Sequence, residues 1–132
     1  MATDRETALY WESRAAEHPL PEDPSGRGTA REPTCSDLLE IGLTVNPQGM
    51  ITAAGFSLTE TACTPIRAAA AYACAVSEGR HVFAVSLMKT KDLYPALSKE
   101  GGPDPEHLHC LLMAEVALKQ AIADYAAAFK RS

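Results

Sequence analysis

Residues 35–58 read CSDLLEIGLTV, NPQG and MITAAGFSL, and this stretch decides the fold. From Cys35 to Val45 one parity of the sequence is largely apolar, which is typical of a strand with one buried face. Residues 46–49 carry proline second and glycine fourth, a pattern that favours a β-turn. A second extended stretch runs from Met50 to about Leu58. The apolar residues of this stretch change from odd to even positions beside Gly55, so we expect a bulge or a break into two strands there.

The flanking sequence predicts helices around this hairpin. Strands followed by helices indicate an α+β fold, with a small antiparallel sheet covered on one face and a long C-terminal helix, in a single domain over residues 1–132. Gly26 and Gly28 precede no phosphate-binding helix, so we assign them no cofactor role. The expected segments are an N-terminal helix over 1–17 that opens with the capping box Thr3-x-x-Glu6, a Pro/Gly-rich loop over 18–33, a helix capped by Thr64 that ends before Gly79, a weaker helical region over 82–97, and a final helix over 106–130.

The composition excludes several classes of protein. The chain has 132 residues, of which 46% are hydrophobic and 22% charged, and its net charge is −5. The longest apolar run is far shorter than the roughly 20 residues of a membrane span, so we expect no membrane insertion. An acidic chain without a basic cluster is poorly suited to nucleic acid. The first residues lack the features of a signal or transit peptide, so we expect a cytoplasmic protein with reduced thiols.

Three of the four cysteines fall at the ends of predicted elements. Cys35 and Asp37 share one side of a strand at its beginning, which fits either a site at the rim of the core or ordinary packing. Cys63 precedes a helix, where the helix dipole favours a thiolate, although a space-filling role is also open. His109 and Cys110 are neighbours in the first turn of the last helix, and both can ligate one centre only where that helix begins irregularly.

The remaining candidates fit ordinary structural roles. Cys74 falls in the middle of a helix among alanines, so we interpret it as a packing residue. His18 and His81 have no companion ligands and are expected to be solvated. No C-x₂-C spacing proves a metal site. Three sulfurs with Asp37 or His109 nevertheless make a set of four ligands, enough for zinc or for a two-iron cluster.

At these residues the chain resembles the iron–sulfur cluster assembly scaffold family, of the IscU and NifU N-terminal type. The resemblance covers about Pro33 to the C-terminus. It is carried by five blocks in order: Pro33-Thr34-Cys35-Ser36-Asp37, the hairpin 43–56, Cys63 before an alanine-rich helix that ends Glu78-Gly79-Arg80, the block 109–115 from His109 to Glu115, and its continuation Ala121-Ile122-Ala123-Asp124-Tyr125.

The resemblance implies a fold of three antiparallel strands under helices, and a scaffold or carrier rather than an enzyme. Such a scaffold builds a [2Fe–2S] cluster from iron and from sulfur supplied by a cysteine desulfurase, then passes it to apo iron–sulfur proteins. The ligands carried over are Cys35, Cys63 and Cys110, with Asp37 and His109 as alternating or auxiliary ligands. The alternative is a zinc-bound sulfur-transfer protein in which Cys110 or Cys63 accepts the persulfide.

The chain also departs from the family pattern. Ser36, Ala62 and Thr64 stand where the family usually has glycine, so the loop around Cys63 is stiffer than in its relatives. The family's chaperone-binding segment Leu-Pro-Pro-Val-Lys corresponds to residues 103–107, where only Pro105 is in register. We therefore expect an Hsp70-type chaperone to bind this chain poorly.

Overall fold

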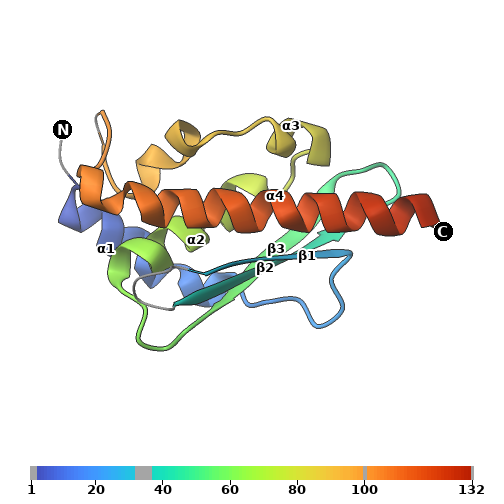
Figure 1. Ribbon diagram of the computed structural model, residues 1–132, viewed down its shortest axis with the longest axis horizontal. Helices are drawn as coiled ribbons and strands as arrows, with labels where there is room; N and C mark the ends of the chain where they lie inside the picture. The colour runs from blue at the N-terminus through green and yellow to red at the C-terminus, as the bar shows by residue number, and fades with distance from the viewer. Residues whose placement is uncertain (1–2, 32–36, 100, 132) are drawn as a thin grey trace.

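The computed structural model describes residues 3–31, 37–99 and 101–131 (Figure 1). One antiparallel sheet has the strand order β1-β2-β3, and helices flank it, so the predicted α+β fold with a long C-terminal helix is confirmed. In the described part of the chain no helix is long and apolar enough to cross a membrane. The elements are α1 (Arg5–Ser13), β1 (Gly26–Arg31), β2 (Leu38–Val45), β3 (Ile51–Leu58), α2 (Thr64–Ser77), α3 (Val82–Ser86) and α4 (Leu108–Arg131), with 3₁₀ turns at Ala15–Glu17, Thr90–Ala96 and Pro105–His107.

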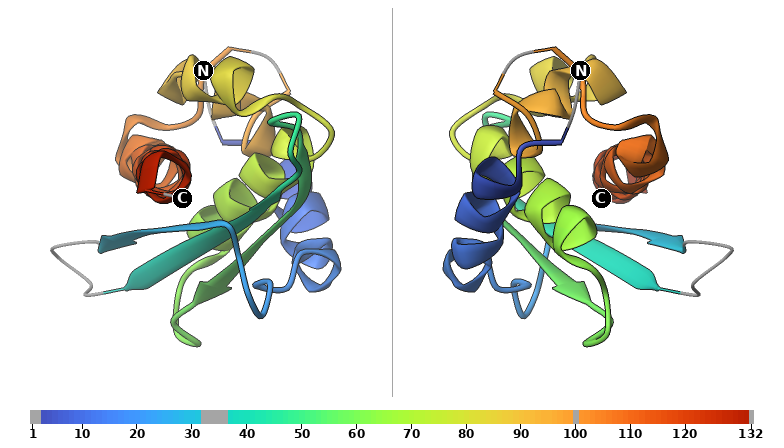
Figure 2. Two further views of the ribbon diagram at one scale, coloured as in Figure 1. Left: turned by 90° about the vertical axis from the view of Figure 1, so that its right-hand side faces the viewer. Right: turned by 90° about the vertical axis from the view of Figure 1, so that its left-hand side faces the viewer.

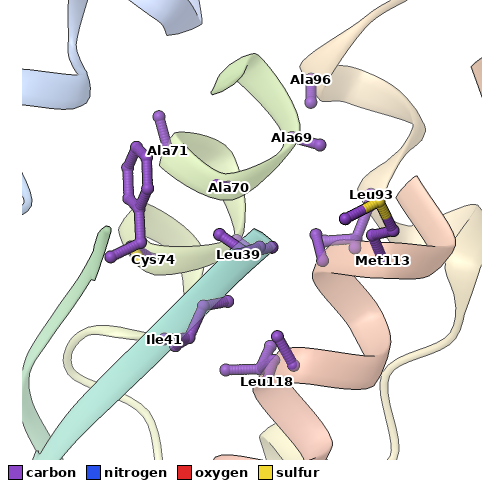
Figure 3. Packing of buried hydrophobic residues seen from close by; sticks show 14 of the residues in the cluster. Leu39, Ile41, Ala69, Ala70, Ala71, Cys74, Leu93, Ala96, Met113 and Leu118 are labelled. Atoms are coloured by element: carbon purple, nitrogen blue, oxygen red, sulfur yellow. The ribbon is translucent and has the colours of Figure 1, made fainter. Parts of the chain in front are cut away.

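The central strand β2 supplies the floor of the core. Leu39, Ile41 and Leu43 are fully buried, as the alternating pattern predicts. Their partners on β3 point to the same face, Phe56 opposite Ile41 and Ala54 opposite Leu43. Figure 3 shows Leu39 and Ile41 between side chains of α2 and α4. This face is therefore the one that the helices cover.

The hairpin between β2 and β3 forms where the sequence predicts it. The Asn46 side-chain oxygen accepts hydrogen bonds from the backbone N–H groups of Gln48 and Met50, at 3.0 and 2.9 Å. Thr44 lies opposite Ala53 but Val45 lies opposite Ile51, so β3 holds one extra residue in a bulge. The parity switch is thus a bulge and not a strand break. It lies before Ala53 rather than beside Gly55.

Helix α2 is the centre of the helical layer, between α1 and α4 (Figure 2). The run Ala68–Ala71 and Ala73 are fully buried, and such small side chains allow neighbouring helices to approach closely. Cys74 is fully buried in the same helix, in agreement with its predicted packing role. Trp11 of α1 meets Tyr72 of α2 edge to face, with ring centroids 4.8 Å apart.

Strand β1 lies inside the segment that the sequence interpretation assigns to a loop, residues 18–33. Its inward positions, Gly26 and Gly28, lie opposite Leu43 and Ile41 of β2, and α4 crosses directly above them. A Cβ atom on Gly28 would be 1.9 Å from the carbonyl oxygen of Ala117, and one on Gly26 would be 2.2 Å from that of Ala121. The Gly-x-Gly is therefore the packing surface for the last helix.

The N-terminal helix begins one residue later than the capping box predicts, and it is shorter than residues 1–17. Its N-cap is Asp4, whose side chain accepts a hydrogen bond from the backbone N–H of Glu6. The Thr7 hydroxyl also donates to this carboxylate, at 2.9 Å, and so lowers the pKa of Asp4. Thr3 binds elsewhere, with its hydroxyl 2.6 Å from Nδ1 of His107.

The prediction of a solvated His18 is wrong, because this residue is buried against the outer edge of β3. Its Nδ1 lies 3.3 Å from the carbonyl oxygen of Ala54 and 3.5 Å from Oε1 of Glu78. Its own carbonyl accepts from the N–H of Phe56, and Glu78 accepts from that of Ala54. These contacts occupy hydrogen-bonding groups that an edge strand would otherwise expose.

The contact between β1 and α4 leads to a graded prediction. Gly28→Ala should lower the free energy of unfolding by about 3 kcal/mol or more, because the new methyl group meets rigid helix backbone. Gly42→Ala should cost less, about 1–2 kcal/mol, since its Cβ would approach only side chains, Leu20 at 3.0 Å and the rings of Pro24 and Pro21 at 3.2 and 3.3 Å. Urea unfolding of both variants measures the difference. Equal losses of stability would contradict the close approach.

Candidate metal-cluster site

The start of β2 carries the first predicted ligands. Asp37 directly precedes the strand and is buried, with only 6% of its surface exposed. Cys35 lies outside the described residues. Its predicted place on the same side as Asp37 therefore stays a prediction.

Cys63 is the N-cap residue of α2, and its thiol is exposed. The sequence predicts Thr64 as the cap, but Thr64 is the first residue of the helix. Its hydroxyl instead donates to Glu12 of α1, at 3.0 Å. In the described structure the Cys63 side chain makes no capping hydrogen bond, so the thiol is available for chemistry.

His109 and Cys110 lie in the first turn of α4, directly after the 3₁₀ turn Pro105–His107. The 3₁₀ turn precedes the helix, and His109 and Cys110 themselves lie in regular α-helix, so their binding to one centre stays a prediction. Sγ of Cys110 is 3.5 Å from Nε2 of His109. Cys110 is buried, at 1% exposure, whereas His109 is exposed. The pair thus joins an inner sulfur to an outer imidazole.

The three elements that carry or follow the candidate ligands, β2, α2 and α4, all begin at one end of the molecule. The starts of β2, α2 and α4 all face the viewer in the right-hand view of Figure 2. The four described candidates, Asp37, Cys63, His109 and Cys110, do not bring three ligand atoms within 4.8 Å of one another. The structure therefore places the starts of these elements at one end and His109 beside Cys110, while the four described candidate ligands stay too far apart to share one metal ion.

A different trio of possible ligands lies just before α4. Asp104, Glu106 and His107 have ligand atoms within 4.8 Å of one another. Glu106 is at the surface, with its side chain 78% exposed, and exposed acidic groups are common without a metal. We assign no metal site to this trio.

A surface hollow of about 340 Å³ lies beside His109, between β1 and α4. Its walls include Ala30 and Arg31 at the end of β1, and Leu112 and Val116 of α4. Both of these α4 side chains are among the exposed large apolar residues. The candidate site therefore has an apolar neighbour on the molecular surface.

Cys74 differs from the candidate ligands in its surroundings. Burial, helped by the nearby charge of Glu78, raises the pKa of its thiol far above the usual range. A thiol that stays protonated is a poor nucleophile and a poor metal ligand. Cys74 is therefore separate from the site, as the sequence predicts.

The sequence analysis does not identify two residues near the segment between β3 and α2, which carries Cys63. Arg67 donates to the backbone oxygens of Thr59 and Glu60, and it faces Glu12 of α1. Only the spacing of Arg67 one turn after Cys63 could have pointed to it. Glu12 gave no signal, because its partners belong to another helix.

Comparison with known proteins gives the family. Residues 12–132 match the family described as NifU-like N terminal domain. The chain is 30% identical over 100 residues to the iron–sulfur cluster assembly enzyme IscU of Drosophila melanogaster, covering 76% of this chain and 61% of that protein. It is 29% identical over 100 residues to the iron–sulfur cluster assembly scaffold protein IscU of Escherichia coli K12, covering 76% of this chain and 73% of that protein.

Solved structures agree on the fold. A NifU-like N-terminal protein from Brucella abortus superposes with a TM-score of 0.68 at 15% identity, over 92% of this chain and 93% of that one. A candidate scaffold protein for the SUF system from Fervidobacterium islandicum gives 0.70 at 13% identity, over 89% and 94%. The family match covers residues 12–132, and the strand order and the long last helix agree with it. The chain therefore belongs to the NifU-like N-terminal domain family of iron–sulfur cluster assembly scaffolds.

Proposed function

We propose that this protein is a scaffold on which a [2Fe–2S] cluster is assembled and from which it passes to apo-proteins. The observation that carries the proposal is the convergence of the starts of β2, α2 and α4, which bear Asp37, Cys63 and Cys110, at one end of the molecule. The proposed ligands are Cys35, Cys63 and Cys110, with Asp37 or His109 as the fourth. Family membership supports this role.

The two described thiols of the proposed ligand set suit different steps of cluster assembly. Cys63 is exposed, so its thiolate can attack the outer sulfur of a desulfurase persulfide, take that sulfur and release the desulfurase thiolate. Cys110 is buried and better placed to retain iron than to meet a partner protein. Reducing two sulfane sulfurs to sulfide takes four electrons. Two come from oxidation of two ferrous ions, and an external thiol or reduced iron–sulfur protein must supply the others.

Asp37 suits the part of a releasable ligand. Thiolates hold iron firmly, whereas a carboxylate is a harder and weaker partner for an iron–sulfur centre. Asp37 directly precedes β2, at the end of the molecule where α2 and α4 also begin, and this position supports a place for it among the ligands. A cluster with one weak ligand can be handed on, which a carrier needs.

Anaerobic reconstitution tests the proposal directly. The protein is incubated with ferrous iron, cysteine, a thiol reductant and a cysteine desulfurase, and bound metal and acid-labile sulfide are then measured. We expect a [2Fe–2S] chromophore with iron and sulfide in equal amounts. Retention of zinc with no cluster formed would reject the scaffold role and favour zinc-dependent sulfur transfer.

Asp37→Ala should separate cluster retention from cluster delivery. The variant should keep a reconstituted chromophore at least as long as the parent, because the three cysteines remain. Delivery to an apo-ferredoxin should slow roughly tenfold, since the exchangeable ligand is lost. Circular dichroism of the acceptor follows the transfer.

Two controls accompany the Asp37 experiment. Asp23→Ala removes an exposed loop carboxylate and should transfer like the parent. Cys35→Ala should lose the chromophore. Faster cluster loss in Asp37→Ala than in the parent would show that Asp37 retains the cluster instead of releasing it.

Metal binding should also stabilise the fold, because its ligands come from separate segments of the chain. At a metal concentration about 100 times the Kd, binding adds about 2.7 kcal/mol to the free energy of unfolding. We expect the melting temperature to rise by several degrees with metal and to fall back when a chelator is added. Calorimetry with and without chelator measures this shift. An unchanged midpoint would count against a shared site.

A further inference from the structure

The connection from β3 to α2 carries Cys63, and it is closed by a turn in which the N–H of Ala62 donates to the oxygen of Thr59, at 3.0 Å. The guanidinium of Arg67 reaches back over this turn. Its Nη2 donates to the carbonyl oxygens of Thr59 and Glu60, both at 3.4 Å. One side chain from the first turns of α2 therefore holds the segment immediately before Cys63.

A second set of contacts connects Arg67 and the start of α2 to α1. Oε2 of Glu12 accepts from the Thr64 hydroxyl, at 3.0 Å, and lies 4.0 Å from Nε of Arg67. Both charged side chains are about a quarter to a third exposed, 26% for Arg67 and 30% for Glu12, so solvent screens their attraction only in part. Glu12 thus holds a hydrogen bond to the residue that follows Cys63 and lies at ion-pair distance from the arginine.

Thr59, whose carbonyl oxygen accepts from Arg67, also contacts the start of β2. Thr59 and Leu38 exchange hydrogen bonds, since the N–H of Thr59 donates to the Leu38 oxygen at 3.2 Å and the N–H of Leu38 donates to the Thr59 hydroxyl at 2.9 Å. Asp37 directly precedes Leu38 in the chain. Through Thr59, Arg67 therefore connects the segment that carries Cys63 to the start of β2, which follows Asp37.

We propose that Arg67, oriented by Glu12, is a positioning residue that fixes the Cys63 thiol relative to the start of β2 when the site takes up metal. This inference rests on the proposed function. The connection has Ala62 and Thr64 beside Cys63, and Pro65 in the first turn of α2 restricts it further. The Arg67 hydrogen bonds are long, so the effect should be modest in size.

Cobalt(II) alone is the probe, because its thiolate charge-transfer absorption reports both binding and sulfur ligation. Anaerobic titration of Arg67→Ala should show cobalt affinity about threefold to tenfold weaker than that of the parent, toward the low side of losses from outer-shell contacts. Arg67→Lys should fall between them, because an ammonium group keeps the charge but not the planar fork. Glu12→Gln should weaken binding less than Arg67→Ala does.

The control that isolates positioning is the Cys63→Ala background. If Arg67 acts through Cys63, Arg67→Ala should cause no further loss of cobalt affinity there, whereas general damage to the fold would weaken binding in both backgrounds. Arg14→Ala removes another arginine, one paired with Glu17, and should bind cobalt like the parent. Calorimetry of the apo-proteins identifies any variant that fails to fold, in which case Arg67→Lys and Glu12→Gln decide the matter.

Each result has a definite reading. Parent-like affinity in Arg67→Ala, or an equal loss in the Cys63→Ala background, would overturn the positioning role and leave the scaffold proposal standing. A parent protein without thiolate charge-transfer absorption would overturn the proposed ligand set, and the positioning role with it. An affinity loss confined to chains that contain Cys63 would establish it.

Discussion

Helix α4 lies directly on the edge strand β1, because two glycines leave no side chain between the helix backbone and the sheet. The carbonyl oxygens of Ala117 and Ala121 occupy the space where side chains of Gly28 and Gly26 would be. Packing of this kind fixes both the height of the helix above the sheet and its position along the strand, since interiors are close-packed and tolerate little displacement. The arrangement of the rest of the chain depends on it.

The same contact secures the edge of the sheet. Because α4 is so close, Asp124 accepts from the N–H of Arg27 at 2.9 Å, and Gln120 accepts from that of Thr29 at 3.2 Å. The opposite edge, β3, is protected by His18 and Glu78. A three-stranded sheet has two edges, and here other parts of the chain supply hydrogen bonds to both.

The position of α4 along β1 also decides where its first turn lies. That turn places Cys110 inside the molecule and His109 outside, at the end where α2 and β2 begin (Figure 2). The contrast between an exposed Cys63 and a buried Cys110 follows from their hosts, a helix N-cap in one case and the inner face of a helix in the other. Cys74, which has the same side chain, takes no part because burial keeps its thiol protonated.

The sequence by itself determined the features that are encoded locally. Alternating residues in β2, the turn at residues 46–49 and the start of α2 near Pro65 follow from periodicity and backbone preference, and so does the placing of Cys63 and Cys110 near helix starts. Tertiary structure alone decided that Gly26–Arg31 is a strand, since two glycines carry no apolar period and β1 exists only between β2 and α4. It also decided the burial of His18 and the brace formed by Arg67 and Glu12. The physical reason is that these partners are distant in the sequence, and a local pattern records the preference of a segment but not the surface against which it will pack.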